Sequence, residues 1–175
     1  SDNEGSRLAA GYGLTAAGAA SQSHLQKACA SPVDSSRALA AFAAGELGAT
    51  ADVDTAKAVA TLATDRDLQT RCNTAEALGS LQAHAEVTVP ALTTLLADED
   101  GQTRFNAAYG LARHGAAAAP ATDALVRALD DENRYVRNHS AEALEQIGTP
   151  EALRALTDFL NVSRWCPITT KDSTF

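Results

Sequence analysis

The sequence predicts an all-α protein, a right-handed α-solenoid of stacked helical hairpins with about five repeat units, the first one partial. The first observation behind this prediction is a set of arginines at steps of 30, 34, 33 and 33 residues: Arg7, Arg37, Arg71, Arg104 and Arg137. The second is a run of small and apolar residues at helical spacing after each arginine. An internal period of this length is typical of solenoids, in which each unit covers the apolar face of its neighbour.

Two apolar stripes in each unit predict a helical hairpin. A small residue follows the arginine by four positions in every unit, and leucine follows it by seven in four units, so both lie on one face of a helix. Another apolar stripe lies upstream of each arginine. The expected elements are a helix at about 6–18, hairpins at about 22–48, 54–82, 89–115 and 120–148, and a helix at about 150–161.

Polar residues and prolines mark the expected helix starts. Side chains suited to accept hydrogen bonds from first-turn amides are Asp34, Asp54, Thr88, Asp100, Asn133 and Thr149. Proline lacks an N–H group that the first turn would leave unpaired, so we expect Pro90, Pro120 and Pro150 in first helical turns.

The repeat divides the chain into two parts. Residues 1–162 are expected to form the solenoid, whereas residues 163–175 abandon the repeat and include Trp165, Ile168 and Phe175. We expect this tail to pack back as a cap, because terminal units of a solenoid must cover an apolar face. The chain begins on a second helix and contains no methionine, which suggests that it is part of a longer polypeptide.

The charge of the chain narrows the class of partner. A formal net charge of −8 disfavours nucleic acid and anionic membranes, which require clustered Lys and Arg. A protein or peptide partner is expected, since this charge accommodates a basic partner or a neutral ligand more easily than an acidic one, and no cofactor is implied. A cytoplasmic location is favoured, because no targeting signal or membrane-spanning segment is visible. Cys29, Cys72 and Cys166 form no CxxC motif and are expected to be reduced, with Cys29 in the core.

An aspartate stands six residues before the arginine in three units. The pattern predicts a structural ladder of ion pairs, Asp65 with Arg71, Asp98 with Arg104 and Asp131 with Arg137, which tie each loop to the helix that follows it. Because the pair recurs, it is interpreted as structural rather than catalytic.

The unit "LDDENRYVRNHSAEALEQIG", residues 129–148, resembles the HEAT-like repeats named after the phycobilisome lyases, whose pattern is L-x-D-x-x-x-x-V-R-x-x-A-A-x-A-L-x-x-I-G. The resemblance covers about residues 6 to 160. It implies a solenoid whose second helices line a concave face. Relatives include bilin lyases, a di-iron hydroxylase and binding scaffolds, so the fold alone does not select a function.

On that concave face, positions two and five after each arginine lie one turn apart. The residues there form the expected binding stripe: Tyr12, Phe42, Asn73, Glu76, Asn106, Tyr109, His139 and Glu142. Aromatic side chains at one end and amides and carboxylates at the other are typical of a peptide or ligand groove. The alternative is that the two glutamates follow the repeat consensus and that the other positions have drifted.

The favoured function is a protein-binding scaffold with no catalytic residues. The alternative is a phycobilin lyase or chaperone-like subunit that positions a tetrapyrrole on an acceptor protein, with Glu76 or Glu142 as acid–base group. The hydroxylase relatives carry His-Glu pairs after the repeat arginine, but the matching pairs are Cys72-Asn73, Phe105-Asn106 and Asn138-His139. No metal site is therefore expected. His24, His84 and His114 are expected at exposed turns and helix ends.

Overall fold

The computed structural model describes residues 22–163, which are helical throughout their regular elements. The α-helices are α2 (Gln22–Cys29), α3 (Asp34–Leu47), α4 (Val53–Ala60), α5 (Leu68–Ser80), α6 (Ala85–Leu95), α7 (Gly101–His114), α8 (Thr122–Ala128), α9 (Arg134–Ile147) and α10 (Pro150–Ser163). Short 3-10 helices are η2 (Gly48–Thr50), η3 (Thr61–Thr64), η4 (Gln82–His84) and η5 (Gly115–Ala121). The expected helix at 6–18, Tyr12 and the tail after Ser163 lie outside the described residues.

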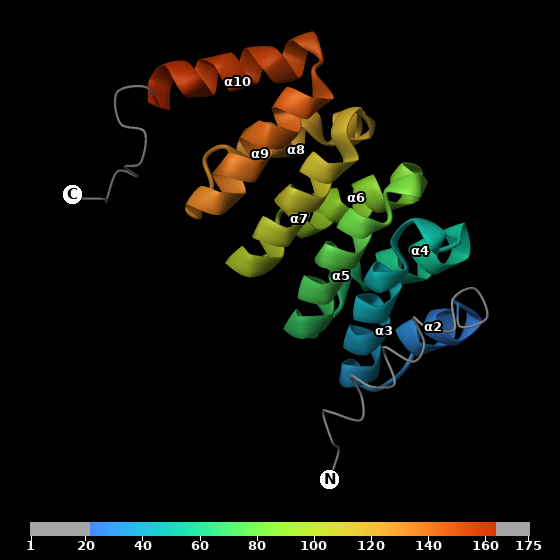
Figure 1. The fold of residues 1–175 in the computed structure, drawn as a ribbon. Coiled ribbons are helices and arrows are strands. Elements are labelled where there is room, and N and C mark those ends of the chain that lie inside the picture. The colour runs from blue at the N-terminus through green and yellow to red at the C-terminus, as the bar shows by residue number, and fades with distance from the viewer. Residues whose placement is uncertain (1–21, 164–175) are drawn as a thin grey trace.

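The helices stack as an α-solenoid, as the sequence predicts. Each second helix packs against the next, so that α3, α5, α7 and α9 form one continuous row. The first helices α4, α6 and α8 form a second row beside it, and α10 covers the end of the stack (Figure 1). This parallel arrangement places equivalent positions of successive units next to one another in space.

Three of the predicted helix starts are confirmed by hydrogen bonds. The carboxylate of Asp100 accepts from the amide of Thr103 at 2.8 Å, and the side chain of Asn133 accepts from the amide of Tyr135 at 2.9 Å. Thr149 precedes Pro150, the first residue of α10, and its hydroxyl accepts from the amide of Ala152. A side-chain acceptor just before a helix satisfies amides that have no partner within the helix.

Other predicted starts are wrong by a few residues. Asp52, not Asp54, caps α4 by accepting from the amide of Thr55 at 2.7 Å. Asp34 lies inside the first turn of α3, where it contacts Arg37 rather than a free amide. The first error arises because Asp52 and Asp54 stand close together and only the backbone decides which of them precedes the helix, and the second arises because α3 begins at Asp34 itself, after Val33.

Helix α6 begins earlier than predicted. Its first residue is Ala85, which places Thr88 and Pro90 inside the helix instead of at its start. Thr88 is fully buried, and its hydroxyl donates to the carbonyl of His84 at 3.2 Å. The 3-10 helix η4 leads directly into α6, so the backbone is already helical before Pro90. Pro120 likewise lies in η5 rather than in an α-helix.

Small residues allow the second helices to approach one another closely. Ala41, Ala75 and Ala108 follow the repeat arginine by four positions and are fully buried. A methyl group built on Gly79 of α5 would lie 2.8 Å from the Cα atom of Gly110 in α7, closer than two carbons can approach. The backbones of α5 and α7 therefore meet at this pair of glycines.

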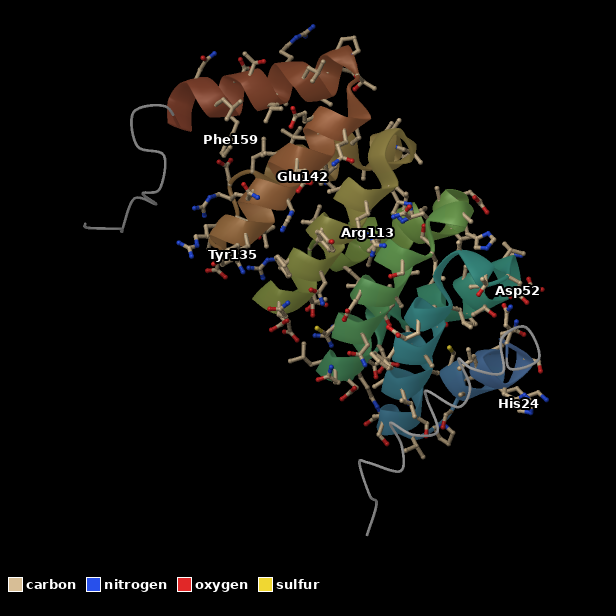
Figure 2. All side chains as sticks on the ribbon, viewed as in Figure 1. His24, Asp52, Arg113, Tyr135, Glu142 and Phe159 are labelled. Atoms are coloured by element: carbon tan, nitrogen blue, oxygen red, sulfur yellow. The ribbon has the colours of Figure 1, made fainter. Side chains whose placement is uncertain are left out.

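The last helix packs through one face only. Leu156 and Phe159 of α10 pack against the core, with Phe159 on the side that faces α9 (Figure 2). Leu153 and Leu160 remain 42% and 50% exposed. The capping role of residues 163–175 would cover this face and stays a prediction. None of the described helices combines the length and apolar character needed to span a membrane.

The arginine ladder exists, but its register differs from the prediction. Three of the repeat arginines pair with the aspartate of the following unit. The N–O distances are 2.6 Å for Arg37 and Asp65, 2.6 Å for Arg71 and Asp98, and 2.7 Å for Arg104 and Asp131. The predicted partner within the same unit contributes its backbone carbonyl instead, as Asp98 does to Arg104 at 3.0 Å. The ladder therefore joins neighbouring units rather than a loop to its own helix.

These pairs are shielded from solvent. The side chains of Arg104 and Asp131 are each 11% exposed. The guanidinium of Arg37 lowers the pKa of the Asp65 carboxyl, and the Asp131 carboxylate raises the pKa of Arg104. Arg137 stands at the end of the ladder, and within residues 22–163 it donates only to the carbonyls of Asp131 and Glu132.

The prediction that His114 is solvent-exposed is wrong. Its side chain is 8% exposed, and Nε2 lies 3.2 Å from the carbonyl oxygen of Leu78 and 3.1 Å from Oγ1 of Thr88. Nδ1 is buried and has no hydrogen-bond partner among the described residues. Burial lowers the pKa of His114 from its usual 6.5, with a smaller contribution from the charge of Arg113. His84 is half-buried and contacts the carbonyl of Ala51 at 2.8 Å.

Mild acid is expected to destabilise the fold through His114. The unfolded chain binds a proton near pH 6.5 whereas the folded chain resists it, so the free energy of unfolding should fall as the pH drops below 6.5 and stay level above it. The free energy of unfolding, measured with urea at a series of pH values, should depend less steeply on pH in the His114→Gln variant than in the parent protein. His24→Gln, at an exposed position on α2, serves as the control. An unchanged slope in His114→Gln would contradict this role.

Candidate functional site

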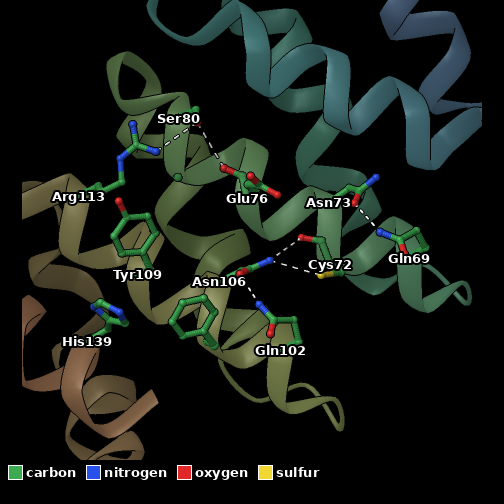
Figure 3. A pocket seen from close by; sticks show the side chains of 13 residues that line it. Gln69, Cys72, Asn73, Glu76, Ser80, Gln102, Asn106, Tyr109, Arg113 and His139 are labelled. Atoms are coloured by element: carbon green, nitrogen blue, oxygen red, sulfur yellow. Dashed lines mark hydrogen bonds between the residues drawn. The ribbon is translucent and has the colours of Figure 1, made fainter. Parts of the chain in front are cut away.

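A groove with a volume of about 620 Å³ runs along the second helices α5 and α7 and reaches α9 (Figure 3). Five residues of the predicted stripe line it: Asn73, Glu76, Asn106, Tyr109 and His139. Phe42 lies next to it, in a smaller depression that shares Asn73, Glu76 and Ser80 with the groove. Glu142 contacts His139 at the edge.

Several lining residues were not predicted. They are Gln69, Cys72, Gly79, Ser80, Gln102, Phe105, Gly110 and Arg113. Four of them, Gln69, Ser80, Gln102 and Arg113, stand one helical turn before or after the predicted positions, at two residues before or nine residues after the repeat arginine. Reading the columns one turn further in each direction would have found them, because residues three or four apart share a helix face.

The two asparagines are tied to the scaffold. Nδ2 of Asn73 donates to the carbonyl of Ala38 at 2.8 Å, and Nδ2 of Asn106 donates to the carbonyl of Cys72 at 3.3 Å. Each side-chain oxygen accepts from a glutamine one turn earlier, Gln69 or Gln102. Both amides therefore bridge one second helix to the preceding one, which reduces their capacity to bind a partner.

An aromatic cluster occupies the end of the groove between α7 and α9. The ring of His139 meets the rings of Phe105 and Tyr109 edge-on, with centroids 5.3 Å and 5.1 Å apart. The rings of Phe105 and Tyr109 are nearly parallel at 6.4 Å, and Tyr135 packs its edge on Phe105 at 6.2 Å. Tyr109 is 45% exposed, so the cluster presents a large amphipathic surface.

Hydrogen bonds orient the polar groups around this cluster. Nδ1 of His139 lies 2.9 Å from a carboxylate oxygen of Glu142, which holds the imidazole ring in place. Arg113 donates to the hydroxyl of Ser80 at 3.2 Å and lies over the ring of Tyr109, 5.9 Å from its centroid. Arg113 and Ser80 thus join α7 to α5 at one end of the groove, as Figure 3 shows.

One cysteine thiol, that of Cys72, lines the groove. Burial, followed by the negative charges of Asp100 and Glu76, raises the pKa of the Cys72 thiol, which therefore stays protonated near neutral pH and is a weak nucleophile. Burial also raises the pKa of Cys29, to about 11. Within residues 22–163 no group of three histidine, cysteine or acidic side chains is placed to hold a metal ion.

Comparison with known proteins identifies the repeat. The family model for HEAT repeats matches residues 23–112 and 89–165. No curated protein matches the chain. Solved structures with a similar fold include the following two. One is an engineered protein with 20% identity and a TM-score of 0.67, for which the match covers 88% of this chain and 74% of that chain.

The other is a designed armadillo repeat protein in complex with the peptide (KR)4. It has 15% identity and a TM-score of 0.65, with 88% of this chain and 76% of that chain covered. Likeness at this level of identity concerns the fold. The family match spans most of the chain and includes every described hairpin. The chain therefore belongs to the HEAT repeat family.

Proposed function

We propose that the protein is a protein-binding scaffold whose groove on α5, α7 and α9 accepts an extended peptide segment of its partner. The observation that carries this proposal is an exposed aromatic ring, Tyr109, held in a groove whose walls are braced by hydrogen bonds between units. Large, rigid aromatic side chains in a hollow contribute most of the binding energy at protein interfaces. A braced groove also loses little conformational entropy on binding.

A basic partner fits the charges of this face. Glu46 and Glu76 are exposed there and form no ion pair with another described residue, whereas the guanidinium of Arg113 is held by Ser80 and Tyr109. Unpaired carboxylates attract and orient cationic groups. The designed armadillo repeat protein, a stack with a similar fold, was solved with a peptide of alternating lysine and arginine, which supports a peptide of this class as the first ligand to test.

Substitution of Tyr109 is expected to weaken peptide binding. Fluorescence anisotropy with a dye-labelled (KR)4 peptide should show about tenfold weaker binding for Tyr109→Ala combined with Glu76→Gln, since loss of a central aromatic costs on the order of 1–2 kcal/mol. Asn106 is left intact in this design because it braces the groove. Glu145→Gln, an exposed position on α9 outside the groove, is the matched control for charge.

Equal affinities of the variant and the control would overturn the proposal. Incubation of the same protein variants with a bilin, followed by removal of the free pigment, tests the bilin lyase alternative, because a bilin retained in the groove would give a visible absorption band that the Tyr109 variant lacks. Thermal melting of each variant separates a loss of binding from a loss of fold.

A further inference from the structure

We infer that the groove and the depression beside it together recognise two side chains of an extended peptide: a basic one in the depression between α3 and α5, and an aromatic one in the groove between α7 and α9, about five or six residues away. This inference rests on the proposed peptide-binding function and adds to it the chemistry and the spacing of the ligand. Its basis is that the face has two ends of different character, which the row of second helices holds at a set separation.

The acidic end is a small depression between α3 and α5, lined by Phe42, Glu46 and Glu76 among others. The close approach of the two helices brings these acids to one place, because a methyl group on Gly45 would lie 3.0 Å from the Cα atom of Ala77. Both carboxylates are exposed, and no described Lys or Arg neutralises either one. A guanidinium or ammonium group of a ligand is the complement of such a pair.

The aromatic end is the cluster of Phe105, Tyr109 and His139. Its rings are packed edge-on at 5.1 Å and 5.3 Å, and Glu142 fixes the imidazole, so the surface is formed before a ligand arrives. The guanidinium of Arg113 already lies near the ring of Tyr109. A second cation would meet some repulsion from Arg113, so this end prefers an aromatic ligand side chain, which can stack on the exposed rings, to a lysine or arginine, whose aliphatic stem can still pack there.

The distance between the two ends follows from helix packing. Packed helices lie about 8–10 Å apart, and the acidic and aromatic ends are separated by two such steps along the row from α3 to α9, or about 16–20 Å. An extended peptide advances about 3.3 Å per residue. A basic and an aromatic residue that are five or six positions apart therefore reach both ends at once.

A series of synthetic peptides tests this spacing. Each peptide has a Gly/Ser host, one Arg and one Trp placed two, five, six or nine positions apart, in both orders, and anisotropy is measured with the full chain. We expect one order at five or six positions to bind at least about tenfold tighter than the other spacings, as linking two weak contacts at a matched span predicts. Equal affinity at every spacing would overturn the inference.

Paired substitutions assign each end. Replacing Arg by Gln in the best peptide should lose about the same affinity as Glu46→Gln with Glu76→Gln in the protein, and the two losses should not add. Replacing Trp by Ala in the peptide should lose about the same affinity as Tyr109→Ala in the protein, and these two losses should not add either. Additive losses would contradict the assignment. If (KR)4 binds but the Arg/Trp peptides bind equally well at every spacing, the proposed function stands and the two-point inference fails. If no peptide binds, the proposed function itself fails.

Discussion

Arg104→Ala is expected to lower the free energy of unfolding by about 2–3 kcal/mol. The substitution removes two bonds to Asp131, at 2.7 Å and 3.2 Å, and leaves a carboxylate that is 11% exposed without its cation. It also frees the carbonyls of Asp98 and Glu99, which both accept from Arg104 at 3.0 Å. The expected cost is below that of breaking a fully buried pair, because the carboxylate keeps 11% of its side-chain surface exposed and can be partly hydrated once the guanidinium is removed.

Arg137→Ala provides the matched control. Arg137 binds the same kind of loop carbonyls, those of Asp131 and Glu132, but within residues 22–163 it holds no carboxylate. Its loss should cost only about 1 kcal/mol. Urea unfolding of the two variants therefore measures the contribution of the pair between units. Equal destabilisation would show that the carbonyl contacts, rather than the ion pair, stabilise the stack.

Gly79→Ala is expected to destabilise the protein by about 1–3 kcal/mol, as overpacking of a close contact does. The new methyl group would lie 2.8 Å from the Cα atom of Gly110, which belongs to the backbone and cannot rotate away. Helices α5 and α7 would have to move apart at the contact that closes one end of the groove. Peptide affinity should fall together with stability, which thermal melting and anisotropy on the same samples would detect.

Gly101→Ala is the control for that experiment. Gly101 is the first residue of α7, and a methyl group there meets only the ends of the Asn133 and Arg104 side chains, at 3.6 Å and 3.7 Å. Alanine loses less conformational freedom than glycine when a helix forms, so this variant should be as stable as the parent or slightly more stable. Comparable losses in both variants would indicate that the close approach of α5 and α7 is unimportant.

The predictions for Arg104→Ala and Gly79→Ala both concern how neighbouring units are stacked, and this stacking also determines the shape of the groove. Asn73 and Asn106 reach across to the preceding helix, and the arginine ladder does the same at the loops. Because the walls of the groove belong to successive units, any change in their spacing alters the surface that a ligand meets. Stability and recognition are therefore expected to vary together in this protein.

The repeat, the helical hairpins and the small residues between helices were all predictable from the sequence. The period of 33 or 34 residues and the residues four positions after each arginine are local features, and local patterns are enough to place one face of a helix inward. The predicted columns also contained Tyr109, Glu76 and His139, which do line the groove. Equivalent positions of a repeat must be adjacent in space, so the column itself was a reliable guide.

Only the tertiary structure decided which groups are partners. The sequence places Asp98 six residues before Arg104, yet the guanidinium of Arg104 takes the carboxylate of Asp131, 27 residues later. The carboxylate of Asp98 is bonded to Arg71 of the preceding unit, and only its carbonyl accepts from Arg104. Asn106, which the sequence places in the binding stripe, lines the groove and also donates to Cys72 of the preceding helix, and His114, which the sequence predicts to be exposed, is buried against Thr88 of α6. Sequence spacing predicts which face of a helix a residue occupies. Which group it contacts across that face depends on the distance between the two packed helices and on their offset along the helix axis, and only the tertiary structure sets these.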